Sequence, residues 1–261
     1  MIESKLDDGL RRKIIATIRH EYEVESAKHE PSGKLSAGQL GKPLLEQVLK
    51  IIGVPQKPNE DYALGLFRRG DSVEENIIKL LKPDEQQKEV SYRNCVGMID
   101  AIKDGEIYEV KSIKNSQYQY LDPENEKQRR TADGLQRVYS GVKYAHALQA
   151  GLYALAEGKD HFTIIYASAD DLRTLPHRVE TDAVKDEIDR IIDEVDKALK
   201  SKTLPRWVAR EDWQDKYHEY SSYPDWITLD PDMAMVKLKN QYPDAYKKLV
   251  GEKWQSFTLW A

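Results

Sequence analysis

Two carboxylates and a lysine are spaced in a pattern typical of a metal site. Asp100 precedes the dipeptide Asp104-Gly105, and Glu109 and Lys111 follow it. Apolar residues flank this dipeptide, which predicts a hairpin with a type I′ turn because both central residues of that turn need a positive φ. A two-residue turn places Asp100 opposite Glu109. The alternation of side chains along a strand places Lys111 on the same face as Glu109.

Opposed carboxylates destabilise a sheet unless another group neutralises them. Hard divalent cations such as Mg²⁺ take oxygen ligands, and two carboxylates with water and a phosphate oxygen suit such a cation. The alternative interpretation is that Asp100, Glu109 and Lys111 are charged groups on the solvated face of an edge hairpin.

A glutamate upstream of the hairpin is a further candidate. Residues 69–81 predict the start of a helix in which Asp71 or Ser72 caps the first turn. The apolar side of this helix carries Ile77, Ile78 and Leu81. These residues stand three, four and seven positions after Glu74, so Glu74 projects from the apolar side and Glu75 lies nearer solvent. A buried carboxylate is costly unless it is paired or bound to a metal. The alternative is that Glu74 completes a capping arrangement with Asp71.

Residues 144–156 predict another helix, because alanine and leucine dominate the segment and Gly158 follows its end. Gln149 and Tyr153 stand four positions apart and share one face of that helix. Gln149 is a candidate for the acidic site. The alternative is a buried glutamine that bonds to a neighbour in the core.

These motifs, in this order, resemble the PD-(D/E)XK nuclease superfamily, in particular its RecB-type and phage-exonuclease-like branches. The family pattern is Gly-x-x-x-Glu on a helix, Gly-x-x-Asp and Glu-x-Lys on strands, and Gln-x-x-x-Tyr on a helix. The matching residues are Gly70 and Glu74, Gly97 and Asp100, Glu109 and Lys111, and Gln149 and Tyr153. The resemblance covers residues 70–168. The segment Ser36 to Leu40 also resembles the Ser-x-x-x-Leu opening of an N-terminal helix in such nucleases.

The resemblance implies a metal-dependent deoxyribonuclease that hydrolyses DNA phosphodiester bonds. Asp100 and Glu109, helped by the Val110 carbonyl group and by Glu74, would coordinate one or two Mg²⁺ or Mn²⁺ ions. Such ions polarise the scissile phosphate and lower the pKa of a bound water. The implied activity is that of an exonuclease on DNA ends in recombination, repair or phage replication.

The remaining motif residues have implied roles around that metal. Lys111 would position or deprotonate the water and stabilise charge on the phosphorus. Gln149 would orient the water or Lys111. Tyr153 would support its helix or contact the DNA.

The single cysteine separates this chain from relatives that hold an iron–sulfur cluster with four cysteines. Cys95 stands alone, so one chain cannot supply four thiolates and we expect no such cluster. Cys95 itself is expected to be a small apolar residue at the start of the first hairpin strand.

Basic residues and tyrosines gather between the hairpin and the helix at 144–156. They are Lys111, Lys114, Lys127, Arg129, Arg130, Arg137 and Lys143, with Tyr118, Tyr120 and Tyr139. Cations beside aromatic rings suit a single strand or a frayed duplex end. We therefore expect DNA contacts at Lys114, Arg129, Arg130 and Lys143, and also at Tyr153. The alternative is a solvated charged loop, and His146 either contacts substrate or packs.

Composition sets the wider limits. The chain has 261 residues, with 40% hydrophobic and 33% charged residues and a net charge of −5. The acidic balance weakly opposes nucleic-acid binding, although a carboxylate-rich site contributes to it. The N-terminus lacks the pattern of a signal peptide, no apolar run approaches the roughly 20 residues of a membrane span, and one cysteine fits a reducing compartment. These features predict a cytoplasmic protein of a microbe or virus, with no membrane partner.

The expected fold is α/β, with a restriction-endonuclease-like core built on a central mixed sheet flanked by helices. Helices are expected at 8–20, 44–52 and 182–200, the last covering the sheet, and strands at 96–102, 107–113 and 162–167. We expect an N-terminal helical part at 1–60, the nuclease core at 61–203, and an aromatic-rich helical extension at 204–261, within one compact unit. The extension wraps the core, forms a subdomain or grips DNA.

Three function classes remain open from the sequence. The first is the metal-dependent nuclease, with linear DNA ends or single strands as partners and a homo-oligomer or a recombination protein as further partners. The second is a catalytically silent nuclease-fold module that binds DNA or protein. The third is a scaffold protein whose hairpin charges lie on the surface.

Overall fold

A six-stranded mixed sheet forms the centre of the structure. The computed structural model of the chain describes residues 7–27, 33–122, 141–218 and 221–251. The strands are β1 (Leu35–Ser36), β2 (Glu85–Tyr92), β3 (Cys95–Lys103), β4 (Glu106–Ile113), β5 (His161–Ser168) and β6 (Thr174–Glu180). Strand β1 pairs with β3 in parallel, β4 pairs with β5 in parallel, and the other pairs are antiparallel. The predicted α/β class with a central mixed sheet is confirmed.

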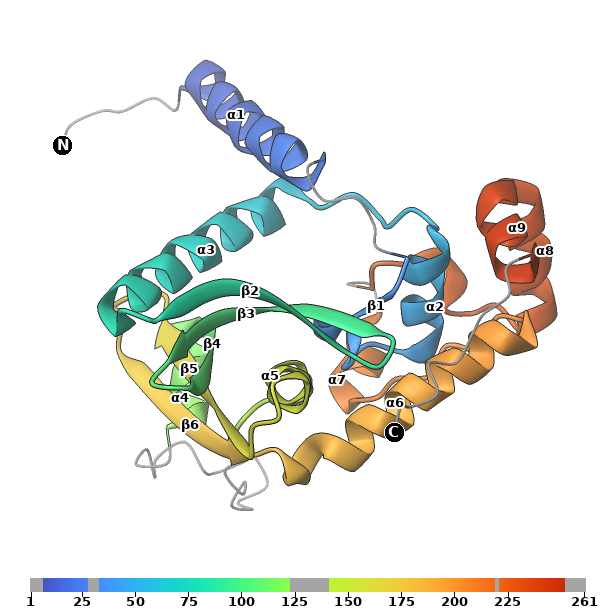
Figure 1. Cartoon of the computed structure of the whole chain (residues 1–261). Coiled ribbons are helices and arrows are strands. Elements are labelled where there is room, and N and C mark those ends of the chain that lie inside the picture. Colours follow the sequence, from blue (N-terminus) through green and yellow to red (C-terminus); the bar gives the residue numbers. More distant parts are fainter. Residues whose placement is uncertain (1–6, 28–32, 123–140, 219–220, 252–261) are drawn as a thin grey trace, which may run out of the picture.

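Helices cover both faces of this sheet and leave it as the middle layer (Figure 1). Helix α3 (Asp61–Leu81) lies on one face and packs Val73, Ile77 and Ile78 against strands β4 and β5. Helix α5 (Tyr144–Ala156) lies on the other face, where it contacts β2, β3, β4 and β5. Strand β5 is therefore buried on both sides, as its apolar sequence predicts.

Helix α6 (Asp182–Ser201) packs on α5 and on α2 (Leu44–Ile52). The expectation that the 182–200 helix covers the sheet holds in part, because α6 contacts β6 and Tyr92 at the end of β2, whereas α5 covers the central strands. Gly151 in α5 explains the close packing, since a Cβ atom there would overlap Val184 Cγ2 and approach Ile188 Cδ1 at 3.2 Å.

Helix α3 begins at Asp61, ten residues before the 71–72 cap that the sequence predicts. Neither Asp71 nor Ser72 caps it; Ser72 Oγ instead donates a hydrogen bond to the Arg68 carbonyl group inside the helix. An isolated glycine such as Gly70 is tolerated within a helix. The preceding helix α1 (Asp8–Ala27) supports the extra turns, because Arg68 pairs with Glu21 at 2.6 Å.

The remaining elements of the described residues are short and surround this core. They are η1 (Ala37–Gln39), α4 (Asn115–Leu121), α7 (Asp212–Lys216), η4 (Pro224–Trp226), α8 (Pro231–Gln241) and α9 (Pro243–Gly251). In the segment Ser36 to Leu40, Ser36 ends β1 and Ala37–Gln39 form a 3-10 turn, so no α-helix opens there. None of the helices in the described ranges is long and apolar enough to cross a membrane.

Tryptophans of the C-terminal part mainly pack. Trp226 is buried, and Trp207 Nε1 donates a hydrogen bond to Glu46 Oε1 at 3.1 Å. Trp213 remains exposed, and Trp254 and Trp260 lie outside the described residues. One hydrophobic core contains residues from Leu35 to Leu249. The expected division at residues 60 and 203 stays a prediction.

Candidate active site

The sheet is split at the position of the acidic residues. The hairpin turns at Asp104 and Gly105, whose φ angles are 50° and 75°, as the sequence predicts. Strands β3 and β4 pair at Lys103↔Glu106, Ile102↔Ile107 and Ala101↔Tyr108, which is the predicted register. Beyond these pairs β4 continues beside β5 and β3 continues beside β2. The two strands therefore part where Asp100 and Glu109 follow.

The split replaces the expected cross-strand pair of carboxylates by a different contact. Asp100 and Glu109 are not ladder partners; the amide of Val110 donates a hydrogen bond to Asp100 Oδ2 at 2.8 Å. The carboxylate of Asp100 thus takes the place of a missing strand partner. Strand β1 occupies the same edge of β3 further along, where Leu35 and Ser36 face Cys95 and Val96.

Glu109 is the most deeply buried acid of the site. Its side chain has no exposed surface and forms an ion pair with the Lys111 ammonium group. The Asp100 carboxyl group lies next to that of Glu109, and no amide or hydroxyl group of the described residues donates a hydrogen bond to Glu109 Oε2. Burial raises the pKa of Glu109 to about 8, against the attraction of Lys111 and with the repulsion of Asp100.

Asp100 and Lys111 complete this cluster. Asp100 is 8% exposed, and burial raises its pKa against the effects of Lys111 and the Val110 amide. Burial also acts to lower the pKa of Lys111, but the carboxylates of Glu109 and Asp100 outweigh it and the pKa is raised. Lys111 is therefore cationic at neutral pH, which suits charge stabilisation better than deprotonation of water.

Glu74 reaches the same cluster from the opposite layer. It stands in the interior of α3, so the capping alternative does not apply. Burial raises the pKa of Glu74 to about 7, with the repulsion of Asp100 next in size. Glu75 is exposed and forms an ion pair with Lys79 at 3.5 Å. Of the two glutamates, Glu74 faces Asp100 and Lys111.

Gln149 and Tyr153 lie behind the acids on α5. Gln149 Nε2 donates a hydrogen bond to the Tyr153 hydroxyl at 2.9 Å. Tyr153 is 2% exposed, so its ring packs inside the protein and is not open to a direct contact with DNA. The absence of a side chain at Gly97 leaves room for the Tyr153 ring. A Cβ atom there would overlap Tyr153 Cε1 and lie 3.0 Å from Ala37 Cβ.

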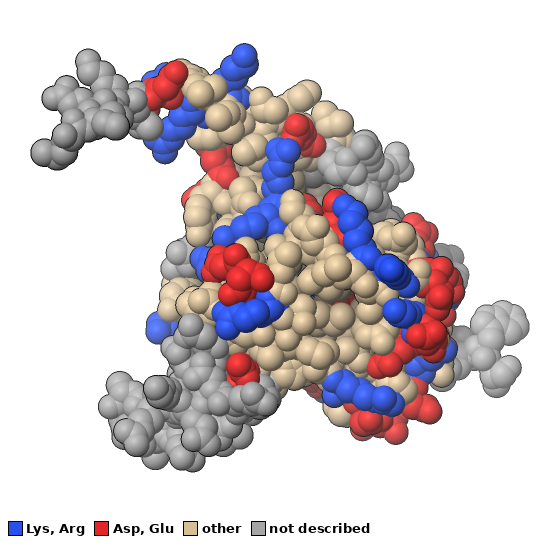
Figure 2. All heavy atoms as spheres, turned by 90° about the vertical axis from the view of Figure 1, so that its left-hand side faces the viewer, with Lys and Arg blue, Asp and Glu red and all other residues tan. Residues whose placement is uncertain are grey.

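The expected DNA contacts are only partly within the described residues. Arg129 and Arg130 lie outside them, as do Lys127, Arg137 and Tyr139 and the side chain of Tyr120. Lys114 Nζ donates a hydrogen bond to the Tyr62 hydroxyl at 3.2 Å. Lys143 Nζ donates one to Gln117 Oε1 at 3.0 Å, and burial lowers the pKa of Lys143. Figure 2 shows lysine and arginine side chains in separate groups on this side of the molecule, without one continuous basic patch.

Two other expected substrate contacts are packing residues. Tyr118 is 5% exposed, and the Arg173 guanidinium group lies 4.9 Å from its ring centre. His146 Nδ1 lies 3.1 Å from the Tyr166 hydroxyl. Burial lowers the pKa of His146 to about 3, and the cations Lys111 and Lys143 add to this effect. His146 is therefore a neutral side chain that packs.

The donor set was tested against a divalent metal. Within the described ranges, no three histidine, cysteine, aspartate or glutamate side chains converge to hold a metal on their own. The two carboxylates of Asp100 and Glu109 are nevertheless hard oxygen donors. Glu109 Oε2, the oxygen that does not pair with Lys111, is the one that a cation would satisfy. Cys95 is buried at the start of β3, as expected, and burial raises the pKa of its thiol.

A cavity of about 640 Å³ opens beside the cluster, between α1, α3, β4 and α4. Glu74 and Lys111 lie on its wall, together with Gly70, Phe67 and Lys114. Asp100 and Glu109 lie deeper in the protein. The cluster is therefore accessible through its lysine and its upstream glutamate.

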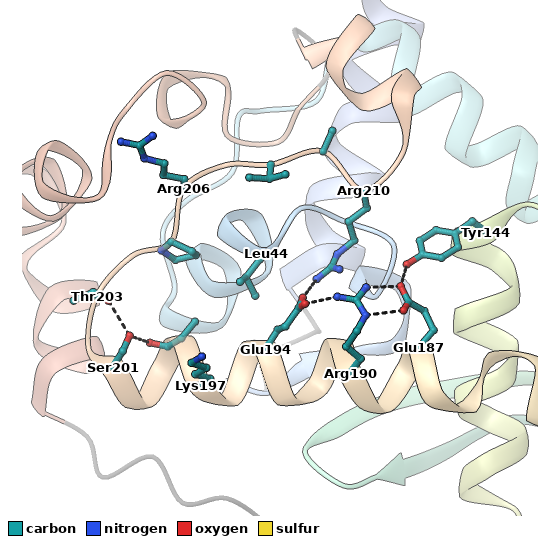
Figure 3. Close-up of a pocket in the computed structure, with 14 residues that line it drawn as sticks. Leu44, Tyr144, Glu187, Arg190, Glu194, Lys197, Ser201, Thr203, Arg206 and Arg210 are labelled. Atoms are coloured by element: carbon teal, nitrogen blue, oxygen red, sulfur yellow. Dashed lines mark hydrogen bonds and ion pairs between the residues drawn. The ribbon is translucent and has the colours of Figure 1, made fainter.

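A second cavity of about 770 Å³ lies between α6 and the segment that follows it (Figure 3). Arg210 extends from that segment to Glu194 at 2.9 Å, and its side chain is 9% exposed. Arg190 pairs with both Glu194 and Glu187. These charges neutralise one another and join the segment to α6. The charged residues that line this cavity therefore stabilise the fold, and we do not assign a ligand to it.

Comparisons with known proteins give a likeness of fold. No protein-family model and no curated protein matches the sequence. The chain is similar to the crystal structure of SSO0001, with a TM-score of 0.52 and 14% identity over 79% of this chain and 91% of that one.

Two crystal structures of an alkaline exonuclease, LHK-Exo from Laribacter hongkongensis, also match. One has a TM-score of 0.42 and 13% identity over 64% of this chain and 90% of that one. The other, a complex with dAMP, has a TM-score of 0.43 and 12% identity over 72% and 95%. At such low sequence identity, the similarity to SSO0001 shows a common fold and nothing about function. Only the residues of the site bear on function.

Proposed function

We propose that this protein is a metal-dependent deoxyribonuclease of the PD-(D/E)XK type. One observation carries the proposal: the cluster of Asp100, Glu109 and Lys111 lies at the split between β3 and β4. Burial of two carboxylates beside one lysine costs desolvation free energy, because one cation cannot neutralise both charges. Glu109 Oε2, which does not pair with Lys111, supplies a reason for a cation to bind there.

Asp100 and Glu109 would hold Mg²⁺ or Mn²⁺, with the Val110 carbonyl group and Glu74 as further donors. When bound, such an ion supplies a Lewis acid for the phosphate and a lowered pKa for its water. The ammonium group of Lys111 holds a phosphate oxygen and neutralises the charge that develops on it. Gln149 is a positioning residue in this scheme, because it bonds to Tyr153.

The finer assignment is an exonuclease that acts on DNA ends in recombination, repair or phage replication. It is supported by the order of the sequence motifs, which resembles the RecB-type and phage-exonuclease-like branches. A partner protein or a homo-oligomer would be compatible with such a role.

The test is digestion of end-labelled linear DNA and of closed circular DNA with Mg²⁺ or Mn²⁺. We expect wild type to degrade linear DNA only, and Lys111→Ala to lose at least about a hundredfold in rate, because charge stabilisation at the phosphate is lost. Lys79→Ala is the matched control, since Lys79 is exposed on α3 and pairs with Glu75. Cutting of circles would identify an endonuclease. A folded wild type without activity would favour the silent binding module.

Metal binding can be measured separately by calorimetry with Mn²⁺. We expect binding by wild type and much weaker binding by Asp100→Asn, in which the amide oxygen still accepts the Val110 hydrogen bond. The absence of binding at millimolar Mn²⁺ would contradict the metal site and favour the scaffold interpretation.

A further inference from the structure

The cavity beside the acidic cluster has an aromatic wall. Tyr22 of α1 and Phe67 of α3 stack with ring centres 6.2 Å apart and an interplanar angle of 27°. They remain 38% and 45% exposed, and both line the cavity. Single exposed apolar side chains are ordinary on protein surfaces, but a stacked pair in a concave site marks a binding surface.

The two helices hold this wall in place. Asn59 Nδ2 donates a hydrogen bond to the Tyr22 hydroxyl at 3.0 Å, which fixes that ring from its polar end. The ion pair of Arg68 with Glu21 links α3 to α1 near the stack. The rings are therefore positioned before any ligand arrives, which reduces the entropy lost on binding.

Cations accompany the aromatic wall. Arg69 and Lys114 line the same cavity, and no carboxylate pairs with either of them within the part of the chain that the structure describes. Asp71 and Glu74 also line the cavity, on the side where Lys111 lies. Stacked rings together with cations that no carboxylate neutralises suit a ligand with π-faces and negative phosphates.

The position of the wall connects it to the proposed chemistry. Tyr22 and Phe67 share one cavity with Lys111 and Glu74, and its volume of about 640 Å³ lies within the usual range of ligand sites. A strand whose phosphate lies at Lys111 would direct a neighbouring base into this cavity. Bases in a duplex are already stacked and paired, so an open ring face favours an unpaired base.

We propose that Tyr22 and Phe67 form a base-stacking subsite for single-stranded DNA next to the scissile phosphate, with Arg69 and Lys114 as phosphate contacts. This inference rests on the proposed nuclease function for the position of the phosphate. It selects single-stranded DNA, or the frayed strand of a duplex end, as the substrate class.

The test compares binding of two fluorescent oligonucleotides of about 12 nucleotides in EDTA, where hydrolysis does not occur. One carries thymine bases and the other is an abasic deoxyribose-phosphate chain of the same length. Phe67→Ala should weaken binding of the thymine strand by at least about fivefold, which corresponds to the loss of one stacked base. Binding of the abasic strand should be unchanged, and Phe67→Trp should retain the affinity of wild type.

Trp213→Ala is the matched control, because Trp213 is an exposed aromatic residue outside this cavity. Equal affinity of Phe67→Ala and wild type for the thymine strand, or equal losses with both oligonucleotides, would overturn the subsite. Digestion by wild type is scored separately: a wild type that hydrolyses DNA while Phe67→Ala binds normally refutes only the subsite. A wild type that hydrolyses no DNA refutes the nuclease, and a base-dependent loss in Phe67→Ala would still support the stacking surface.

Discussion

Replacement of Gly97 by alanine tests why a glycine stands three residues before Asp100 in the Gly-x-x-Asp motif. The added Cβ atom would overlap Tyr153 Cε1 and lie 3.2 Å from Tyr153 Cδ1 and 3.0 Å from Ala37 Cβ. Carbon atoms in contact are normally about 3.5–4.0 Å apart. Tyr153 cannot move away easily, because it is 2% exposed and its hydroxyl accepts a hydrogen bond from Gln149. Overpacking of this kind costs about 1–3 kcal/mol of unfolding free energy.

The assay is urea denaturation of wild type, Gly97→Ala, Tyr153→Ala and the double variant. Tyr153→Ala removes a large buried ring and should itself cost about 3–5 kcal/mol. It also removes the overlap with the ring, so Gly97→Ala should cost less in that background, where the 3.0 Å contact with Ala37 Cβ remains. The cycle should therefore show a coupling free energy of about 1–3 kcal/mol between the two positions.

Gly70→Ala serves as the matched control for this cycle. A Cβ atom at Gly70 meets no atom within 4 Å, and Gly70 lies in the interior of α3. The variant should be more stable than wild type by up to about 1 kcal/mol, because alanine favours helix more than glycine does. Equal losses of Gly97→Ala with and without the Tyr153 ring would refute the steric explanation.

Three further predictions follow from the charges. The pKa of His146 falls from 6.5 to about 3 on folding, so the unfolded chain binds more protons and stability should fall as pH drops below about 6.5. Relative to His146→Gln, wild type should lose about 3 kcal/mol of unfolding free energy between roughly pH 7.5 and 4.5, and equal pH profiles would contradict this. Glu74→Gln should slow DNA hydrolysis more than Glu75→Gln, because Glu74 faces Lys111 and Glu75 faces solvent; single-turnover rates decide, and a loss confined to Glu75→Gln reverses the assignment. Arg210→Ala should lower the unfolding free energy by about 2 kcal/mol in urea, since it removes the hydrogen bonds of a largely buried guanidinium group to Glu194 and to the Lys42 carbonyl group, whereas the exposed Lys247→Ala should change it by less than about 1 kcal/mol.

Local signals in the sequence predict the centre of the fold. Asp104-Gly105 gives the hairpin and the register of its first pairs, because the φ requirement of the turn is local. The alanine- and leucine-rich composition of residues 144–156 predicts helix α5, and the apolar run of β5 predicts that this strand is buried on both faces. These features depend on neighbouring residues, which the sequence displays directly.

The errors arise where distant contacts decide the structure. Helix α3 extends to Asp61 through Gly70 because α1 packs beside it, and no local signal shows that contact. Strand β2 is mostly polar and exposed, so its pairing with β3 is not visible in its pattern. The split of the hairpin at Asp100 also depends on a distant partner, since β1 pairs with the edge of β3 along which a longer β3–β4 ladder would run.

That split also has a mechanical consequence. Asp100 belongs to the half of the sheet that contains β1 and β2, whereas Glu109 belongs to the half that contains β5 and β6. Between β3 and β4, the described ladder consists of the three residue pairs next to the turn. Beyond that ladder, the Val110–Asp100 hydrogen bond joins the two strands, and a cation bound to both carboxylates would add a second cross-link between the halves. Amide exchange in β3 and β4 should then slow together when the metal is added, even far from the ligands themselves.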